Sequence, residues 1–173
     1  FVWLAMANAK YDTLEGFLFP DTYRFDKDAH PNQILNKILR RFESKTEGLR
    51  KEAALSGEDF YEIIIMASIL EKEVPPADMP LAAGVLWRRL ELGMPLQADA
   101  TLVYALGRTI VKSDTTSLNS PYNTYKYKGL PPTPISNPGL AALTAALQPQ
   151  KSNYLYYLSR PRDGGTVFSR TLE

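Results

Sequence analysis

The residues with the clearest chemical potential are two glutamates, Glu71 and Glu73, at the end of an apolar run. Residues 60–70 are hydrophobic at nearly every position, which predicts a helix buried on all sides, and Pro75 and Pro76 end it. A carboxylate at the C-terminal end of such a helix loses hydration and meets partial negative charge, and both effects raise its pKa. A general acid working near neutral pH needs this property. We therefore take Glu71 as the candidate catalytic acid and Glu73, on another helix face, as a supporting or substrate-binding residue; alternatively, both are ordinary solvated residues.

A second set of candidates combines aromatic rings with amide, hydroxyl and carboxylate groups. Its members are Gln97, Asp99, Thr101 and Tyr104 in one segment, and Tyr122, Asn123, Thr124 and Tyr125 in another. Sugar rings have apolar faces and polar edges, so aromatic rings beside hydrogen-bonding groups suit a carbohydrate ligand. The alternative is that these residues pack onto the core and have no ligand.

The composition excludes several classes of chemistry. The chain has no cysteine and a single histidine, His30, which excludes zinc fingers, thiol nucleophiles and His-Glu-x-x-His metalloproteases, and we expect neither a metal nor a cofactor. Because 20 basic residues face 19 acidic ones, we expect no broad cationic surface for nucleic acid. The longest apolar run, residues 63–70, is too short to cross a bilayer.

The elements that position these side chains follow from periodicity and turn residues. Helices are predicted at residues 31–47, 56–73 with a capping-box start, 80–92, 97–106 and 137–147. Strands are predicted at residues 14–25, 154–158 and 166–169, with a turn at 163–165 before the last. Central helices with short strands at both ends indicate a single α+β domain.

Six runs of the sequence occur in the order found in one known family. They are residues 14–23 (LEGFLFPDTY), 67–73 (ASILEKE), 83–90 (AGVLWRRL), 93–99 (GMPLQAD), 120–125 (SPYNTY) and 129–139 (GLPPTPISNPG). Each run is weak evidence alone, but together they resemble the catalytic domain of the MltG/YceG-like endolytic murein transglycosylases. The resemblance extends from residue 14 to the end of the chain.

The resemblance implies a lyase that cleaves the bond from N-acetylmuramic acid to N-acetylglucosamine inside peptidoglycan glycan strands. The family's catalytic glutamate lies in the run that contains Glu71, and so maps onto it. The C6 hydroxyl of the muramic residue attacks C1 and leaves a 1,6-anhydro end. An intramolecular nucleophile has an effective concentration of roughly 10⁵ M or more, so one carboxylate suffices. Gln97, Asp99, Asn123, Thr124 and nearby tyrosines are expected to hold the sugar and exclude water.

The resemblance also implies a biological setting. Residues 1–173 are expected to form a YceG-like catalytic domain, a soluble fragment of a longer bacterial protein whose membrane helix and LysM-like domain are absent. The apolar opening without a methionine, residues 1–9, agrees with a fragment. The expected location is the outer side of the cytoplasmic membrane, where the protein takes part in cell-wall assembly. Peptidoglycan is the expected substrate and cell-wall synthases are further expected partners.

The chain departs from the family pattern at three positions. The family commonly reads Gln-Ser-Asp-Pro-Thr where this chain has Ala98 and Ala100, and it often has a histidine where Thr166 stands. No role of that serine, proline or imidazole is carried over to this chain.

Two other functions compete with the transglycosylase hypothesis. One is a non-catalytic peptidoglycan-binding or scaffold domain of the cell-wall machinery. The other is a lysozyme-like hydrolase that pairs Glu71 with a second carboxylate, for which the candidates are Glu15, Glu73 and Asp99.

Overall fold

The fold is helical apart from one small hairpin. The computed structural model describes residues 13–160 and 165–172. Its elements are α2 (Pro31–Ser56), α3 (Phe60–Glu73), α4 (Met79–Glu91), α5 (Asp99–Leu106), α6 (Asp114–Ser117), α7 (Leu140–Leu147), β1 (Tyr156–Ser159) and β2 (Thr166–Ser169). This confirms the α+β class. No helix among the described residues is both long and apolar enough to cross a membrane.

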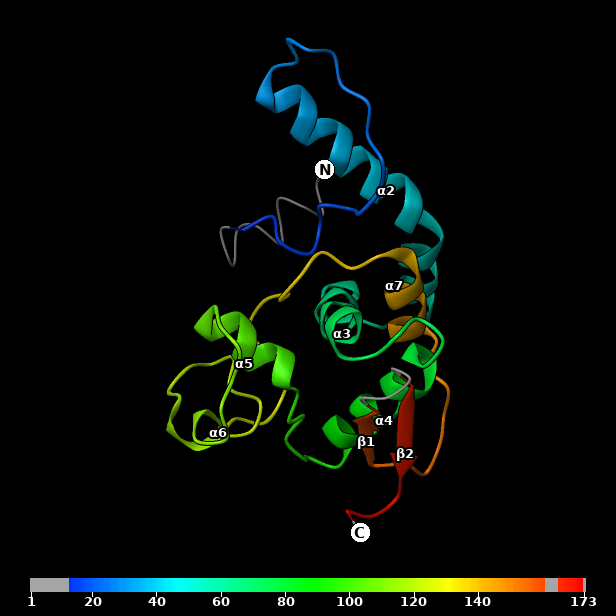
Figure 1. Cartoon of the computed structure of the whole chain (residues 1–173). Helices are drawn as coiled ribbons and strands as arrows, with labels where there is room; N and C mark the ends of the chain where they lie inside the picture. Colours follow the sequence, from blue (N-terminus) through cyan, green and yellow to red (C-terminus); the bar gives the residue numbers. More distant parts are fainter. Residues whose placement is uncertain (1–12, 161–164, 173) are drawn as a thin grey trace.

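The centre of the molecule is α3. Every residue from Ile63 to Leu70 is buried, as the all-round apolar pattern predicted, and α3 contacts α2, α4, α5 and α7. In Figure 1, α3 lies in the middle, with α7 and the C-terminal half of α2 on one side and α4 with the hairpin below it. Burying a large aliphatic side chain contributes roughly 1.5–3 kcal/mol. The core therefore fixes α3 and, with it, the position of its last turn.

The boundary between α2 and α3 differs from the prediction. Helix α2 continues to Ser56 instead of ending near residue 47, and it ends because Gly57 adopts a left-handed conformation with φ 75°. The predicted capping-box start of α3 at Ser56 is wrong: Asp59 is the N-cap, and its side chain accepts a hydrogen bond from the Tyr61 amide. The N-terminal half of α2 extends away from the body (Figure 1).

The strands predicted within residues 14–25 are wrong, because no part of this segment forms a strand. The amides of Gly16 and Leu18 donate to Asn137 Oδ1 at 2.8 and 3.0 Å, where a strand would bond a neighbouring backbone. Phe17 and Phe19 are buried in the core. An asparagine side chain from a distant loop thus replaces the strand partner.

The predicted C-terminal hairpin is confirmed. Strands β1 and β2 pair antiparallel, with Tyr157 opposite Phe168, and both of these residues pack against the core. Residues 163 and 164 of the predicted turn at 163–165 lie outside the described residues.

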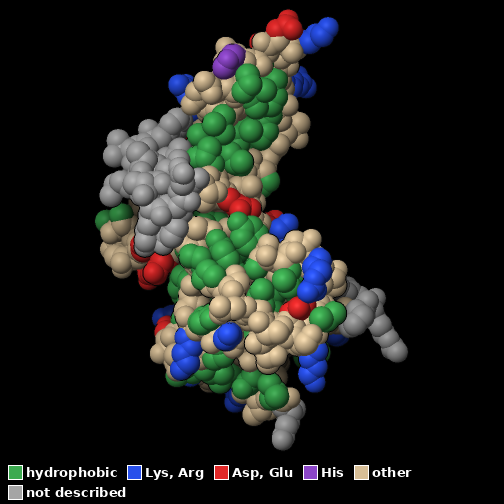
Figure 2. Space-filling model, turned by 90° about the vertical axis from the view of Figure 1, so that its left-hand side faces the viewer, with side chains coloured by type: hydrophobic (Ala, Val, Ile, Leu, Met, Phe, Trp, Pro, Cys, Tyr) green, Lys and Arg blue, Asp and Glu red, His purple; other side chains and the backbone are tan. Residues whose placement is uncertain are grey.

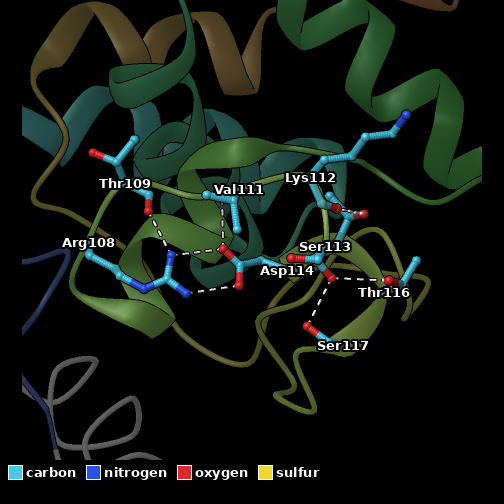
Figure 3. Close-up of polar contacts among 9 residues, drawn as sticks. Arg108, Thr109, Val111, Lys112, Ser113, Asp114, Thr116 and Ser117 are labelled. Carbon is cyan, nitrogen blue, oxygen red and sulfur yellow. Dashed lines mark hydrogen bonds and ion pairs between the residues drawn. The ribbon is translucent and has the colours of Figure 1, made fainter.

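The first part of the long connection between α5 and α7 contains an ion pair. Arg108 donates two hydrogen bonds to Asp114, Nη1 to Oδ2 and Nη2 to Oδ1, both at 2.9 Å, and the Val111 amide donates to Oδ2 at 2.8 Å (Figure 3). The pKa of Asp114 is lowered, chiefly by the hydrogen bonds from Arg108. This ion pair orders α6, from which the connection passes on toward residues 120–127.

Candidate active site

The last residue of α3, Glu73, has both carboxylate oxygens engaged by other elements. Oε1 accepts a hydrogen bond from the amide of Ala100, in the first turn of α5, at 2.8 Å. Oε2 accepts one from the hydroxyl of Tyr157, on β1, at 3.2 Å. The end of α3, the beginning of α5 and the hairpin therefore converge on one carboxyl group.

The surroundings of Glu73 favour its protonated form. Burial raises the pKa of this carboxyl above its ordinary value, and the neighbouring charge of Asp99 raises it further. The hydrogen bonds from Ala100 and Tyr157 act in the opposite direction without cancelling these effects. A raised carboxyl pKa is the property that a general acid requires near neutral pH.

Glu73 also lines a cavity of about 390 Å³. The cavity walls come from the end of α3, from α5 and from the loop before α7: Lys72, Glu73, Asp99, Ala100, Val103, Tyr104 and Ile135. Its volume lies within the range of roughly 300–1,000 Å³ typical of small-ligand sites. A carboxyl group with a raised pKa in such a cavity can deliver a proton to a bound ligand.

A larger cavity of about 620 Å³ lies along α2 and lacks this chemistry. It contains Glu47, which accepts a hydrogen bond from Lys51 at 2.7 Å, and this contact lowers the pKa of Glu47. A carboxyl that ionises more readily than usual is a poor proton donor near neutral pH.

The position of Glu71 differs from the prediction. We expected its carboxyl to lose hydration at the end of the buried helix, and this was wrong, because the side chain is exposed. Oε2 of Glu71 accepts a hydrogen bond at 3.0 Å from the amide of Gly139, the N-cap of α7. A carboxylate there satisfies a free donor and interacts favourably with the helix dipole. This contact gives Glu71 a structural role, and its catalytic role stays a prediction.

Among the polar candidates, Asp99 and Tyr125 lie at the same site as Glu73. The Tyr125 hydroxyl donates to Asp99 Oδ1 at 2.5 Å, and Asp99 lines the cavity. Burial and this contact raise the pKa of Tyr125 well above its ordinary value, so its hydroxyl stays protonated. Gln97 precedes them with an exposed side chain and an unusual positive φ of 52°.

Three of the predicted sugar-binding residues are buried and bonded within the protein. Thr101 and Thr124 share a hydrogen bond between their hydroxyls at 2.9 Å. The amide group of Asn123 donates to the carbonyl of Leu118 at 2.9 Å, while its Oδ1 accepts from the amide of Tyr125 at 3.1 Å. These hydrogen bonds give the three side chains a structural role, and their contact with a sugar stays a prediction. They hold the two loops together and so place Asp99 and Tyr125.

The remaining tyrosines form a second polar cluster beside the cavity. Tyr104 donates to Glu15 Oε2 at 2.6 Å, and its ring centroid is 4.9 Å from that of Tyr122. Tyr122 in turn shares a hydrogen bond of 2.5 Å with Thr133. Of these residues Tyr104 lines the cavity, where its exposed ring is available to a sugar face.

Glu73 was predicted only as a supporting or substrate-binding residue, and no pattern in the sequence pointed to Tyr157. Tyr157 was assigned only to a strand, and the partners of Glu73 lie 27 and 84 positions away in the chain. Within the described residues, no group of three or more His, Asp or Glu side chains is arranged to hold a metal ion.

On the face shown in Figure 2, basic and acidic side chains are interspersed, and hydrophobic ones gather at the centre and on the part of the molecule that extends from the body with the N-terminal half of α2.

Comparisons with known proteins agree on one family. The model of the YceG-like family matches residues 4–173. The chain is 39% identical to the endolytic murein transglycosylase of Bacillus subtilis, over 92% of this chain and 45% of that protein. It is 30% identical to the enzyme of the same name from Streptococcus pneumoniae serotype 2, over 96% of this chain and 32% of that protein.

A solved structure supports the same relationship. The crystal structure of a YceG-like protein from Listeria monocytogenes superposes with a TM-score of 0.87 at 36% identity. The match covers 98% of this chain and 61% of that one. The chain thus spans less than half the length of the two transglycosylases and less than two thirds of the solved protein.

Proposed function

The chain belongs to the YceG-like family, and from this membership we propose that it is the catalytic part of an endolytic murein transglycosylase. Its substrate is the glycan strand of bacterial peptidoglycan, cut between N-acetylmuramic acid and N-acetylglucosamine. The names of the Bacillus and Streptococcus relatives support this activity. The observation that carries the proposal is the half-buried carboxyl of Glu73, with its raised pKa, in a cavity beside Asp99 and Tyr104.

We assign the acid role to Glu73 in preference to Glu71. Glu71 was chosen because a carboxyl at the end of the buried helix was expected to lose hydration. In the structure the carboxyl that loses hydration is that of Glu73. Glu73 has the raised pKa and the cavity, whereas Glu71 is exposed and bonded to the start of α7.

In the proposed reaction, protonated Glu73 gives its proton to the glycosidic oxygen as the bond from C1 to that oxygen breaks. The N-acetylglucosamine side leaves with a free 4-hydroxyl. The C6 hydroxyl of the muramic residue then bonds to C1, and its proton passes to the Glu73 carboxylate. The acid is restored, no water is consumed, and the product carries a 1,6-anhydro end. Intramolecular attack removes the need for a carboxylate that activates water.

Other residues of the site bind and orient the sugar in this proposal. Tyr104 offers an aromatic face at the cavity wall, and sugar rings stack on such faces. Gln97 and Tyr125 offer polar groups to the ring hydroxyls. Asp99 lies close enough to influence the charge of Glu73 and so favours the protonated acid before cleavage.

A lysozyme-like hydrolase is the second candidate, because Asp99 provides another carboxylate in the same cavity. That carboxylate accepts a hydrogen bond from the Tyr125 hydroxyl, and a second carboxylate held beside the acid is the arrangement that a hydrolase needs for a nucleophile or a base. The family setting further suggests action at the outer side of the cytoplasmic membrane, near cell-wall synthases, and we include both in the proposal.

The test is cleavage of purified, uncrosslinked glycan strands, with products identified by mass spectrometry. We expect the chain to produce ends that lack one water relative to hydrolysis products, Glu73→Gln to produce none, and Glu71→Gln to retain cleavage. If Glu71→Gln is inactive and Glu73→Gln is active, the acid is Glu71. Products that have gained a water would support the hydrolase, and binding without new ends would support a scaffold domain.

A further inference from the structure

The carboxyl group of Glu73 is held by two donors of different kinds. Ala100 offers a backbone amide to Oε1 at 2.8 Å, and Tyr157 offers a phenolic hydroxyl to Oε2 at 3.2 Å. An amide N–H can only donate, whereas a hydroxyl can donate or accept. Oε1 therefore has to remain an acceptor, and Oε2 is the oxygen that can carry the proton without losing a hydrogen bond.

The two donors come from elements that the core fixes independently. Ala100 lies in the first turn of α5, where its amide has no partner within the helix. Tyr157 projects from β1 opposite Phe168 and packs against the core. Arg89 ties the two segments together, since its guanidinium donates to the carbonyls of Leu155 and Leu96 at 2.6 and 2.7 Å.

We infer that Tyr157 is a positioning residue of the glycan-cleaving site, whose hydroxyl orients the Glu73 carboxyl and stays hydrogen-bonded to Oε2 in both protonation states. As a donor it stabilises the carboxylate left after the glycosidic oxygen is protonated. When the proton returns to Oε2, a lone pair of that oxygen can still accept from Tyr157, so the proton remains directed at the substrate and the hydrogen bond from the Ala100 amide to Oε1 is undisturbed. This inference rests on the proposed function, and no motif or comparison used above assigns Tyr157 a role.

Several charged or titratable groups face this pair, and their effects have to be separated. Asp99 and Tyr104 approach from α5, Tyr125 from the loop after α6, Arg89 from α4, and Lys72 from α3 itself. The hydroxyl of Tyr157 remains protonated throughout the working range, because burial and the Glu73 charge raise its pKa far above 10. Changes in the pH profile of cleavage therefore report on the carboxyl groups.

Tyr157 and Asp99 act on Glu73 in opposite directions. The hydrogen bond from Tyr157 lowers the pKa of Glu73, and the charge of Asp99 raises it. Cleavage should decline at high pH as the acid loses its proton, which gives the pH profile an alkaline limb. Removing the Tyr157 hydroxyl should move this limb to higher pH, and removing the charge of Asp99 should move it to lower pH.

The main test is Tyr157→Phe, which removes one hydroxyl and keeps the ring. We expect the alkaline limb of the pH profile to move to higher pH and kcat at the optimum to fall at least about tenfold, the lower end of the loss expected for one hydrogen bond to a charged group. KM should change little. The control is Tyr156→Phe on the same strand, whose ring lies 5.2 Å from the Arg89 guanidinium carbon; it should leave the pH profile unchanged.

Two further variants examine the same carboxyl. Ala100→Pro removes the amide donor at a first-turn position that α4 itself fills with Pro80, and should also move the alkaline limb to higher pH. Asp99→Asn should move it to lower pH. Each variant is first compared with the parent chain by circular dichroism and thermal unfolding.

The outcomes separate this inference from the proposed function. A Tyr157→Phe variant that is folded and shows the parent's kcat and pH profile, while Glu73→Gln is inactive, would overturn the role of Tyr157 alone. Full activity of Glu73→Gln would overturn the acid assignment and, with it, this inference. A tenfold loss in Tyr157→Phe with a shifted limb, against an unchanged Tyr156→Phe, would support the inference.

Discussion

Replacing Arg89 by methionine should test how the fold holds its site together. Arg89 is 5% exposed and is a buried cation with no carboxylate partner among residues 13–160 and 165–172. Its guanidinium instead donates to the carbonyls of Leu155 and Leu96 at 2.6 and 2.7 Å. These carbonyls lie just before Tyr157 and Asp99, so one side chain positions both.

The expected magnitude follows from these bonds. A hydrogen bond from a charged group contributes about 1.5–3 kcal/mol, so two of them amount to roughly 3–6 kcal/mol. Part of this is offset, because methionine no longer requires a guanidinium to be buried without a counter-charge. We expect Arg89→Met to lower the free energy of unfolding by about 2–4 kcal/mol, out of the roughly 5–15 kcal/mol typical of a domain.

The assay is urea unfolding followed by circular dichroism, with Arg88→Met as the matched control. Arg88 precedes Arg89 on α4, and its buried Nε has no hydrogen-bond partner within the described part of the chain. Removing an unsatisfied donor should therefore leave stability unchanged or raise it slightly. Equal destabilisation by both substitutions, or a larger loss for Arg88→Met, would refute the reasoning.

Three further predictions concern other parts of the fold. Ser68→Ala should cost about 1–3 kcal/mol in urea unfolding, because it leaves the amide of Ile135 without its 2.9 Å partner; an unchanged midpoint would contradict this. Gly84→Ala should lower the melting temperature and Gly84→Ser no less, since an added Cβ would lie 2.1 Å from the Gln150 carbonyl oxygen; a parent-like melting curve would show that the backbone yields. The ion pair of Asp114 lowers its pKa, so its stabilisation is complete above the unfolded-state pKa and is lost as pH falls below about 4. The unfolding free energies of the chain and Asp114→Asn should differ at pH 7 and converge in acid, and a constant difference would argue against the pair.

The sequence predicted the helices well where one face or all faces are apolar. Helix α3 has no polar face in its centre, and the pattern identifies it without knowledge of its neighbours. The end of α2 was missed because two helix boundaries lie within three residues of each other. Gly57 is the C-cap of α2 and Asp59 is the N-cap of α3. Residues 14–25 have strand-like composition, but the partner of their amides is a side chain, Asn137, which no local pattern reveals.

The candidate site was predicted in part. The sequence indicated the run that contains Glu71 and Glu73 as the place where a carboxylate meets the core, and in the structure Glu73, not Glu71, lies there. Which of the two is the less exposed depends on α5 and β1, whose contacting residues are distant in the chain. Distant contacts also decide the surroundings of Thr101 and Asn123. Their hydroxyl and amide groups could bind a sugar or form buried hydrogen bonds between loops, and the sequence does not distinguish the two. Long-range packing, and not residue type, decides between these roles.

The most direct test of the central claim is cleavage of uncrosslinked glycan in water enriched in heavy oxygen, comparing the chain with Glu73→Gln. The variant should be folded, because the glutamine side chain has nearly the same size and its oxygen can still accept the hydrogen bond from the Ala100 amide. We predict that the unaltered chain releases fragments whose new muramic ends carry no heavy oxygen, and that Glu73→Gln releases none. Heavy oxygen in the new ends, or cleavage by Glu73→Gln at the parent rate, would contradict a reaction driven by this acid and an intramolecular hydroxyl.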